Sequence, residues 1–525
     1  MSSTIQVIQP SHHPSIRKQP RHVVEEVPEK SMDDFVDEVR WLFEAPLELR
    51  QLMLMSGVLG EEYKEKLQSS DISMLPSYQH TLPTGKEKGD FLALDVGGST
   101  LRIALVRLAG EEPGVDKLQT KRIRTFAIDR VIRDLQGREF FDWMADRIAE
   151  TLTYNNRTHS TQNAKLPMGL AWSFPIEQTS QRSGRILAMG KGFRALQGVE
   201  GQDLTTLIMT SCQRKNLNVT LKAIVNDSSA TLLAQAYLDP RTRISLILGT
   251  GTNSAIYLPT SLLGRSKLLS RPAQWTETPP PHLVINTEMS MFGGRTLPQT
   301  RWDKILNSTH PLPDFQPLEY KSTGRYLGEI VRLILLEASE STAFFSQTFP
   351  PSLLDPYTLE TTTLAAFEAD SSHDLHIASA VFQASHPLLK GLCPSVADLR
   401  LVRTVSRFVT TRAAAFIACA LHALWKLRTE AEGLGFEREC EARVTVACNG
   451  GVVEKFPGFR RRVQGVLDGL CGVSCGGDGD AGRRNWDGEG GLGGEGVGMI
   501  ELKIATGESC VSGAGVAVAC ADAEG

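Results

Sequence analysis

The chain has 525 residues, of which 41% are hydrophobic and 22% are charged. This length exceeds what one ordinary hydrophobic core supports, so we expect two domains in a soluble globular protein. The net charge of −4 gives no electrostatic case for nucleic acid as a partner.

Residues 1–30 are predicted to form a flexible tail. Its basic residues are not followed by the apolar stretch of a secretory signal. Glu25, Glu26 and Glu29 argue against an organelle transit peptide, because such peptides are poor in acidic residues. Nine cysteines without a C-x-x-C pair predict reduced thiols in a cytosolic protein, not a disulfide framework or a zinc site.

The predicted elements alternate between helices and strands after this tail. A helix capped by Ser31 is followed by a proline-bearing loop over 75–85. An apolar run over 413–425 predicts a buried helix with Arg412 and Lys426 at its ends, and it is shorter than the roughly 18 residues of a membrane span. The remaining elements are strands over 91–95 and 102–106, an amphipathic helix over 138–153, and strands over 168–173, 223–225, 244–248 and 443–447. This alternation predicts an α/β fold.

Residues 472–498 differ from the rest of the chain because glycine dominates them. Such a stretch buries too little apolar surface to offset its chain entropy, so we expect a flexible surface insertion. No strand leads into it, so it does not have the context of a phosphate-binding loop.

Three segments have the residue types that phosphoryl transfer requires. Asp95 ends a predicted strand and precedes a glycine turn, where backbone amides can approach phosphate and the carboxylate can hold hydrated Mg²⁺. A second glycine turn begins at Gly249 after another predicted strand. Asp227 follows a third strand, at the end where α/β enzymes place catalytic groups. Each segment also has an ordinary interpretation, as a hairpin turn, a loop or a helix cap.

These three segments, in this order, resemble the hexokinase family. The resemblance covers residues 35–470 and 499–520, and its motifs include 74–78, 82–95, 173–175, 191–193, 286–288 and 326–333. It implies a two-lobed actin-like ATPase (ribonuclease H-like) fold, with the sugar between a small and a large lobe. We expect residues 31–225 to form mostly the small lobe and 226–525 mostly the large one.

The resemblance also implies roles for individual residues. Asp227 matches the catalytic base of the family, and Lys191 matches a second catalytic residue that also contacts sugar. The implied sugar contacts are Ser173, Lys191, Asn226, Asp227, Asn253, Glu288 and Glu319. The implied ATP contacts are Asp95, Gly97, Gly98, Ser99, Thr100, Arg102, Gly249, Thr250, Gly251, Thr252, Gly450, Ser512 and Gly513, with Mg²⁺ held through water by Asp95.

The sequence departs from the family pattern in three places. Gly190 stands before Lys191 where the family has threonine, Ser99-Thr100 replaces Thr-Asn, and Asn449 replaces aspartate. The first change removes a hydroxyl from the sugar pocket and resembles the fungal N-acetylglucosamine kinase-like branch. We therefore expect a 6-kinase for glucose or N-acetylglucosamine, with the second used at least as well as glucose. The alternative is a hexokinase-like regulatory protein that binds sugar but turns over poorly.

Overall fold

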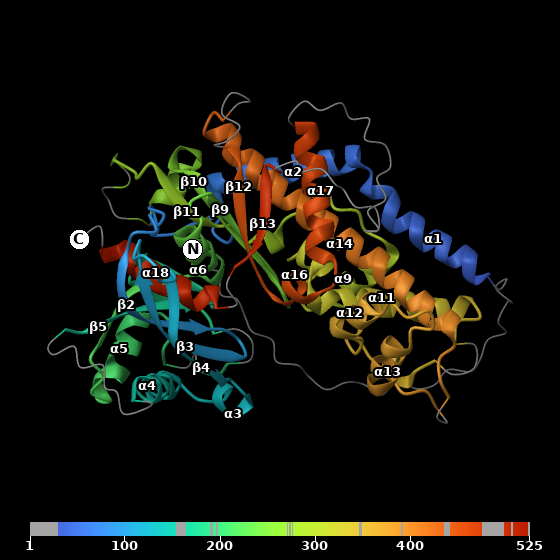
Figure 1. Ribbon diagram of the computed structural model, residues 1–525, viewed down its shortest axis with the longest axis horizontal. Helices are drawn as coiled ribbons and strands as arrows, with labels where there is room; N and C mark the ends of the chain where they lie inside the picture. Colours follow the sequence, from blue (N-terminus) through green and yellow to red (C-terminus); the bar gives the residue numbers. More distant parts are fainter. Residues whose placement is uncertain are drawn as a thin grey trace, which may run out of the picture.

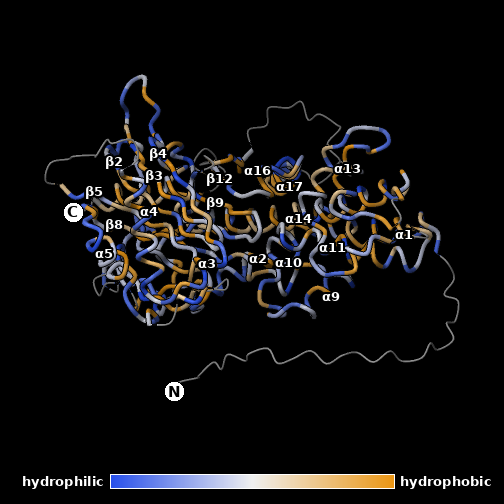
Figure 2. Tube along the Cα trace, turned by 90° about the horizontal axis from the view of Figure 1, so that it is seen from below, coloured by the Kyte–Doolittle hydropathy of each residue, from blue (hydrophilic) through white to orange (hydrophobic). Residues whose placement is uncertain are grey.

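The protein is a two-lobed α/β structure, seen in a computed structural model (Figure 1). Two separate sheets define the lobes, and we call them the small sheet and the large sheet. In Figure 2 hydrophobic segments lie mainly inside both lobes and hydrophilic ones toward their surfaces. The structure describes residues 30–522 apart from 154–163, 190–192, 196–197, 270, 272–274, 276, 346–348, 390–391, 435–441, 475–497 and 506–507.

The small sheet has five strands in the order β4-β3-β2-β5-β8. The pairs β4–β3 and β3–β2 are antiparallel, whereas β2–β5 and β5–β8 are parallel. The elements of this lobe are β2 (Lys88–Val96), β3 (Thr100–Ala109), β4 (Leu118–Ala127), α3 (Arg130–Arg133), α4 (Arg138–Thr153), β5 (Leu166–Trp172), β6 (Ile176–Ser180), β7 (Ser183–Ile186), α5 (Leu204–Arg214) and β8 (Val219–Val225). The helix expected over 138–153 is confirmed by α4.

The large sheet repeats this strand order as β11-β10-β9-β12-β13, with β1 added at the edge beside β11. In chain order each core sheet is therefore arranged third, second, first, fourth, fifth. Its strands are β1 (Leu75–Pro76), β9 (Thr242–Leu248), β10 (Thr252–Pro259), β11 (His282–Asn286), β12 (Val444–Asn449) and β13 (Ile500–Ile504). The loop expected at 75–76 is thus a short edge strand, a position that tolerates Pro76 because one side needs no ladder donor.

Two helices, α6 (Asp227–Leu238) and α18 (Ser509–Asp522), join the sheets. Helix α6 packs on β9 and β10, α18 packs on β2 and β5, and the two helices contact each other. A Cβ atom on Gly513 would lie 1.8 Å from the Ala230 carbonyl oxygen, and one on Gly169 would lie 2.0 Å from that of Ala514. Close packing of α18 therefore requires glycine at both positions.

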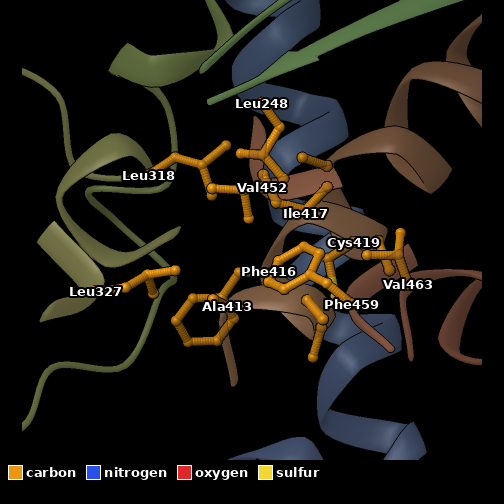
Figure 3. Packing of buried hydrophobic residues seen from close by; sticks show 14 of the residues in the cluster. Leu248, Leu318, Leu327, Ala413, Phe416, Ile417, Cys419, Val452, Phe459 and Val463 are labelled. Carbon is orange, nitrogen blue, oxygen red and sulfur yellow. The ribbon is translucent and has the colours of Figure 1, made fainter. Parts of the chain in front are cut away.

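The remaining helices surround α14 (Val396–Ala431) beside the large sheet (Figure 1). Figure 3 shows Phe416, Ile417 and Cys419 of α14 within this core, and burying a side chain such as Phe416 contributes about 1.5–3 kcal/mol. These helices are α1 (Met32–Glu44), α2 (Leu49–Ser69), α7 (Arg265–Leu268), α9 (Arg301–Thr309), α10 (Glu319–Ser322), α11 (Gly324–Ser341), α12 (Thr361–Ala369), α13 (His376–Ser385), α16 (Gly451–Lys455) and α17 (Phe459–Ser474), with 3₁₀ turns at Ala45–Leu47, Thr260–Leu262, Met289–Met291 and Pro351–Leu354.

Helix α14 is longer than the sequence predicts. It has 36 residues, so Arg412 and Lys426 both lie within the helix and not at its ends. The helix is long and apolar enough to cross a membrane by composition, but 94% of its apolar window is buried inside the protein, as in a core helix. A cytosolic location stays a prediction.

The chain termini do not follow the simple division at residue 225. Ser31 caps α1 as predicted, since its Oγ accepts from the Asp34 amide at 3.1 Å. However, α1 and α2 pack against α14 on the large-sheet side, whereas α18 packs on the small sheet. The predicted domain boundary remains a proposal. The N-terminal helices α1 and α2 lie with the large sheet, and the C-terminal helix α18 lies on the small sheet. Most of the glycine-rich segment lies outside the described residues, although α17 continues through Gly472 to Ser474.

Candidate active site

The segment Asn226-Asp227 connects the small sheet to the helix pair. Asn226 caps α6: its Oδ1 accepts from the Ser228 amide at 2.9 Å and from the Ser228 hydroxyl at 2.7 Å. Asp227 is the first residue of α6, and its Oδ1 accepts from the same amide at 2.7 Å. The positive end of the helix dipole favours a carboxylate there. The ordinary interpretation as a cap therefore holds for Asn226, while Asp227 lies where the parallel strand β8 ends.

Side-chain amides and a carboxylate from the large sheet form a cluster next to this segment. Asn253, in β10, donates from Nδ2 to Asn286 Oδ1 at 2.9 Å, and the distances from the same nitrogen to Asn226 Oδ1 and to Glu288 Oε1 are both 3.4 Å. Asn286, the last residue of β11, donates from its own Nδ2 to Glu288 Oε1 at 2.8 Å. Three predicted sugar contacts, Asn226, Asn253 and Glu288, are therefore brought together.

A left-handed backbone conformation places Glu288 in this cluster. Its φ of 50° is uncommon for a residue with a side chain. The preceding residue is fixed in position, because the amide and the hydroxyl of Thr287 both donate to the Ser254 carbonyl, at 2.9 and 2.8 Å. Such conformations are enriched at functional sites, although six other non-glycine residues in the described part of the chain also have a positive φ.

The electrostatic surroundings of Glu288 are unfavourable for its charge. Burial raises the pKa of Glu288 above its ordinary value, and the negative charges of Asp227 and Glu319 raise it further. Hydrogen bonds from Asn286 and Asn253 oppose this shift without cancelling it. Three carboxylates from α6, the β11 end and α10 are thus close enough to interact, and a cationic or hydroxyl-rich ligand would relieve their repulsion.

Glu319 is connected to the second glycine turn. It begins α10, and its Oε2 accepts from the Thr252 amide at 3.1 Å. A Cβ atom on Gly251 would lie 2.9 Å from that oxygen, so a larger residue at position 251 would require the Glu319 carboxylate to shift. The Thr252 hydroxyl donates to the Ile247 carbonyl at 3.0 Å, while Thr250 is exposed.

The first glycine turn is closed by its own residues. Arg102 Nη1 donates to Asp95 Oδ2 at 2.8 Å, across the paired ends of β2 and β3. The Gly97 amide donates to the Thr100 carbonyl at 3.0 Å, which leaves Ser99 exposed at the tip. Ser173 follows β5 beside this hairpin, where its amide donates to the Val96 carbonyl at 3.3 Å.

The start of α18 lies between this hairpin and Asp227. Burial raises the pKa of the Cys510 thiol, and the negative charges of Asp95 and Asp227 raise it further. The Cys510 sulfur also lies 3.8 Å from the Asp227 carbonyl oxygen. Asp95 and Asp227 are therefore both within electrostatic range of Cys510, although 132 positions separate them in the sequence.

The adenosine-side residues have structural explanations as well. Gly450 has a φ of 119°, and a Cβ atom there would lie 2.5 Å from the Leu248 carbonyl oxygen. Ser512 and Gly513 are buried in α18, and Gly513 is needed for contact with α6. Their roles in binding ATP stay predictions.

Gly190 and Lys191 lie outside the described residues, and so does Gly192. Within the part of the chain that the structure describes, no group of three or more His, Cys, Asp or Glu residues is arranged to hold a metal ion.

Sequence reasoning missed three members of the site. Asn286 bridges two predicted sugar contacts, Ser228 fixes Asn226, and Cys510 lies beside both Asp95 and Asp227. For Asn286 the sequence did contain a signal, because this side-chain amide stands two positions before the predicted sugar contact Glu288. For Cys510 the sequence contains no comparable signal, because its position depends on how α18 packs.

Comparisons with known proteins identify the family that this chain resembles. Two family models, both described as hexokinase, match residues 40–237 and 243–520. A hexokinase from Schwanniomyces occidentalis is 28% identical over 460 residues, covering 85% of this chain and 91% of that protein. A hexokinase from Kluyveromyces lactis is 30% identical over 407 residues, covering 76% of this chain and 77% of that protein. A solved structure of a Schistosoma mansoni hexokinase complexed with glucose has a TM-score of 0.71 and 27% identity, covering 93% of this chain and all of that chain.

Proposed function

The chain belongs to the hexokinase family and is an ATP-dependent sugar kinase; from this premise we propose that it phosphorylates the 6-hydroxyl of a hexose or an N-acetylhexosamine. The observation that carries this proposal is the convergence of Asn226, Asn253 and Glu288 beside Asp227. Amides and carboxylates are the partners that sugar hydroxyls require once water is excluded.

Asp227 is the general base in this proposal. Its carboxylate takes the proton of the sugar 6-hydroxyl as that oxygen bonds to the γ-phosphorus of ATP. The bond from the γ-phosphorus to the β,γ-bridging oxygen breaks, and ADP leaves with that oxygen. The position of Asp227 at the first turn of α6, next to the amide cluster, supports this role.

The other sugar contacts hold the ring so that the 6-hydroxyl faces Asp227. The Glu288 carboxylate and the neighbouring amides can accept from and donate to hydroxyls, which favours a polar ligand with several of them. Ser173, Lys191 and Glu319 complete the proposed sugar contacts, and Lys191 also stabilises charge on the transferred phosphoryl group. Orientation of this kind contributes as much to such reactions as proton transfer does.

The two glycine turns are the proposed phosphate contacts. Asp95 is a fitting partner for hydrated Mg²⁺, since this ion usually takes one or two carboxylates and completes its shell with phosphate and water. Bound with ATP, Mg²⁺ neutralises charge on the phosphates. Arg102, which is paired with Asp95 in this structure, is 41% exposed at its side chain and can turn toward phosphate.

The identity of the sugar depends on the residue before Lys191. Gly190 lacks the hydroxyl and the two carbons of threonine, so a glucose oxygen loses a partner and the pocket gains space. This observation favours N-acetylglucosamine as a second candidate beside glucose, whereas a water in place of the threonine would leave glucose binding intact.

A coupled assay of ADP release with glucose, N-acetylglucosamine and no sugar tests the function. We expect sugar-dependent ADP release, with kcat/KM for N-acetylglucosamine at least equal to that for glucose, and a shift toward glucose in Gly190→Thr. Sugar binding without ADP release would instead support the regulatory alternative. A strong preference for glucose that Gly190→Thr does not change would remove the argument from Gly190 but leave the kinase assignment.

A further inference from the structure

The Asn286 side chain connects two proposed sugar contacts through both ends of its amide. Its Oδ1 accepts from Asn253 Nδ2 at 2.9 Å, and its Nδ2 donates to Glu288 Oε1 at 2.8 Å. Its Oδ1 also lies 3.4 Å from the Ser228 hydroxyl, next to the base-bearing segment. It therefore contacts residues of β10, the β11 end and α6.

The hydrogen-bond chemistry permits one orientation of this chain of groups. An ionised Glu288 only accepts, so Asn286 must present its NH₂ to the carboxylate and its oxygen to Asn253. Asn253 must in turn present its NH₂, which leaves its oxygen toward the Ser254 amide, 2.7 Å away. A reversed Asn286 amide would face Glu288 with oxygen against oxygen. The charge on Glu288 thus fixes both amides.

The backbone holds Asn286 in place independently of any ligand. Asn286 pairs with Ala255 of β10 on one side and with Leu75 of β1 on the other. The next residue, Thr287, is bonded to the Ser254 carbonyl through both its amide and its hydroxyl. Asn286 is therefore a fixed point from which the less constrained Glu288 side chain can be oriented.

We propose that Asn286 is a positioning residue that holds the Glu288 carboxylate and the Asn253 amide in the orientation required for sugar binding. This inference rests on the proposed function, because it concerns the same sugar site. Asn286 acts through its two neighbours and needs no contact with the sugar itself.

This role predicts a specific pH dependence. The hydrogen bond from Asn286 lowers the pKa of Glu288, against burial and against the charges of Asp227 on α6 and Glu319 on α10. Without that bond the pKa of Glu288 rises further. Sugar binding by the ionised carboxylate is lost as the pH falls through this pKa, so the loss begins at a higher pH in a variant without Asn286.

The test is glucose and N-acetylglucosamine binding by titration calorimetry of the full chain across a pH series, without ATP. Asn286→Ala removes both bonds, and Asn286→Asp keeps the shape and the acceptor but replaces the donor to Glu288 with a carboxylate oxygen, which also adds a like charge beside Glu288. Thr287→Val is the matched structural control, because it deletes a neighbouring hydrogen bond outside the cluster. Asn286→Ala is also combined with Glu288→Gln.

We expect both Asn286 variants to bind sugar about ten- to a hundredfold more weakly at neutral pH, the usual effect of losing a hydrogen bond to a charged group. The midpoint of the pH dependence should move upward in both, and not in Thr287→Val. In the Glu288→Gln background, Asn286→Ala should weaken sugar binding by a much smaller factor. The KM for ATP should not change. A uniform loss at every pH, or full additivity with Glu288→Gln, would overturn the positioning role. Absence of sugar binding by the wild type would instead overturn the proposed function, and this inference with it.

Discussion

Asp303 is a buried carboxylate and Glu288 a partly buried one on the large-sheet side, and their surroundings are opposite. Asp303 receives both terminal nitrogens of Arg412, at 2.6 and 2.7 Å, and the amide and hydroxyl of Thr300, each at 2.7 Å. Burial alone would raise the pKa of Asp303, but Arg412 and Thr300 bring the pKa below its ordinary value. For Glu288, neutral amides oppose burial and two further acids, and the pKa is raised.

The difference distinguishes a structural carboxylate, Asp303, from one that we propose binds sugar, Glu288. Asp303 completes the capping box of α9 with Thr300 and joins this helix to α14, so all of its bonding capacity is used within the protein. The left-handed backbone and the nearby negative charges destabilise Glu288 in its position, and a bound ligand would relieve the repulsion. The complete set of partners around Asp303 therefore supports a structural role, and the incomplete set around Glu288 supports the proposed sugar site.

The largest expected effect follows from breaking the Asp303 pair. Arg412→Ala leaves a buried, unpaired carboxylate and should lower the free energy of unfolding by about 3–5 kcal/mol. Lys426→Ala on the same helix is the control, because its pair with Glu430 is half-exposed and should contribute at most about 1 kcal/mol. Urea denaturation of the ligand-free protein measures both.

The Arg412 pair also has a predicted pH dependence. Because the folded pKa of Asp303 is lowered, the stability it contributes is present above the ordinary value of 3.8 and is lost as the pH falls through the folded value. This loss should be absent from Arg412→Ala. Equal stability of Arg412→Ala and Lys426→Ala would show that Asp303 has no structural role of this kind.

Glu288→Gln should have the opposite effect on stability. The raised pKa means that Glu288 loses its stabilising contribution as the pH rises from its ordinary value of 4.5 through the folded value. The glutamine variant does not undergo this loss. Without ligand at neutral pH, its free energy of unfolding should therefore exceed that of the wild type by about 0.5–2 kcal/mol. It should also bind sugar more weakly. Thermal unfolding at acidic and neutral pH tests this, and a variant less stable than wild type at neutral pH would refute the electrostatic argument.

The smallest expected effect concerns Glu319. Gly251→Ala places a Cβ atom 2.9 Å from Glu319 Oε2, so the carboxylate must shift, and we expect this shift to weaken its hydrogen bond with the Thr252 amide. Loss of one such bond, about 1 kcal/mol, should weaken sugar binding about fivefold in the absence of ATP. Gly249→Ala is the matched control, since its Cβ atom would make only an ordinary 3.4 Å contact with the Gly451 amide. Equal sugar affinities of the two variants would contradict a role of Glu319 in sugar binding.

Local sequence patterns predicted much of this architecture but not its long-range pairs. The amphipathic spacing at 138–153 gave the bounds of α4, and the Asn226-Asp227 step was placed correctly at the end of β8. The burial of Arg412 could not be predicted, because its partner Asp303 is 109 positions away. The network through Asn286 likewise depends on how β10 and β11 pair, which single-segment periodicity does not contain.

The central claim, that Asp227 is the base of a sugar kinase, is tested most directly by comparing turnover and sugar binding in Asp227→Ala. A general base usually contributes about 10²–10⁴-fold, and loss of an orienting carboxylate adds to this. We predict that sugar-dependent ADP release falls by at least about 10²-fold while calorimetry still detects sugar binding and the variant remains folded. ADP release near the wild-type rate would contradict the assignment of Asp227 and the mechanism derived from it.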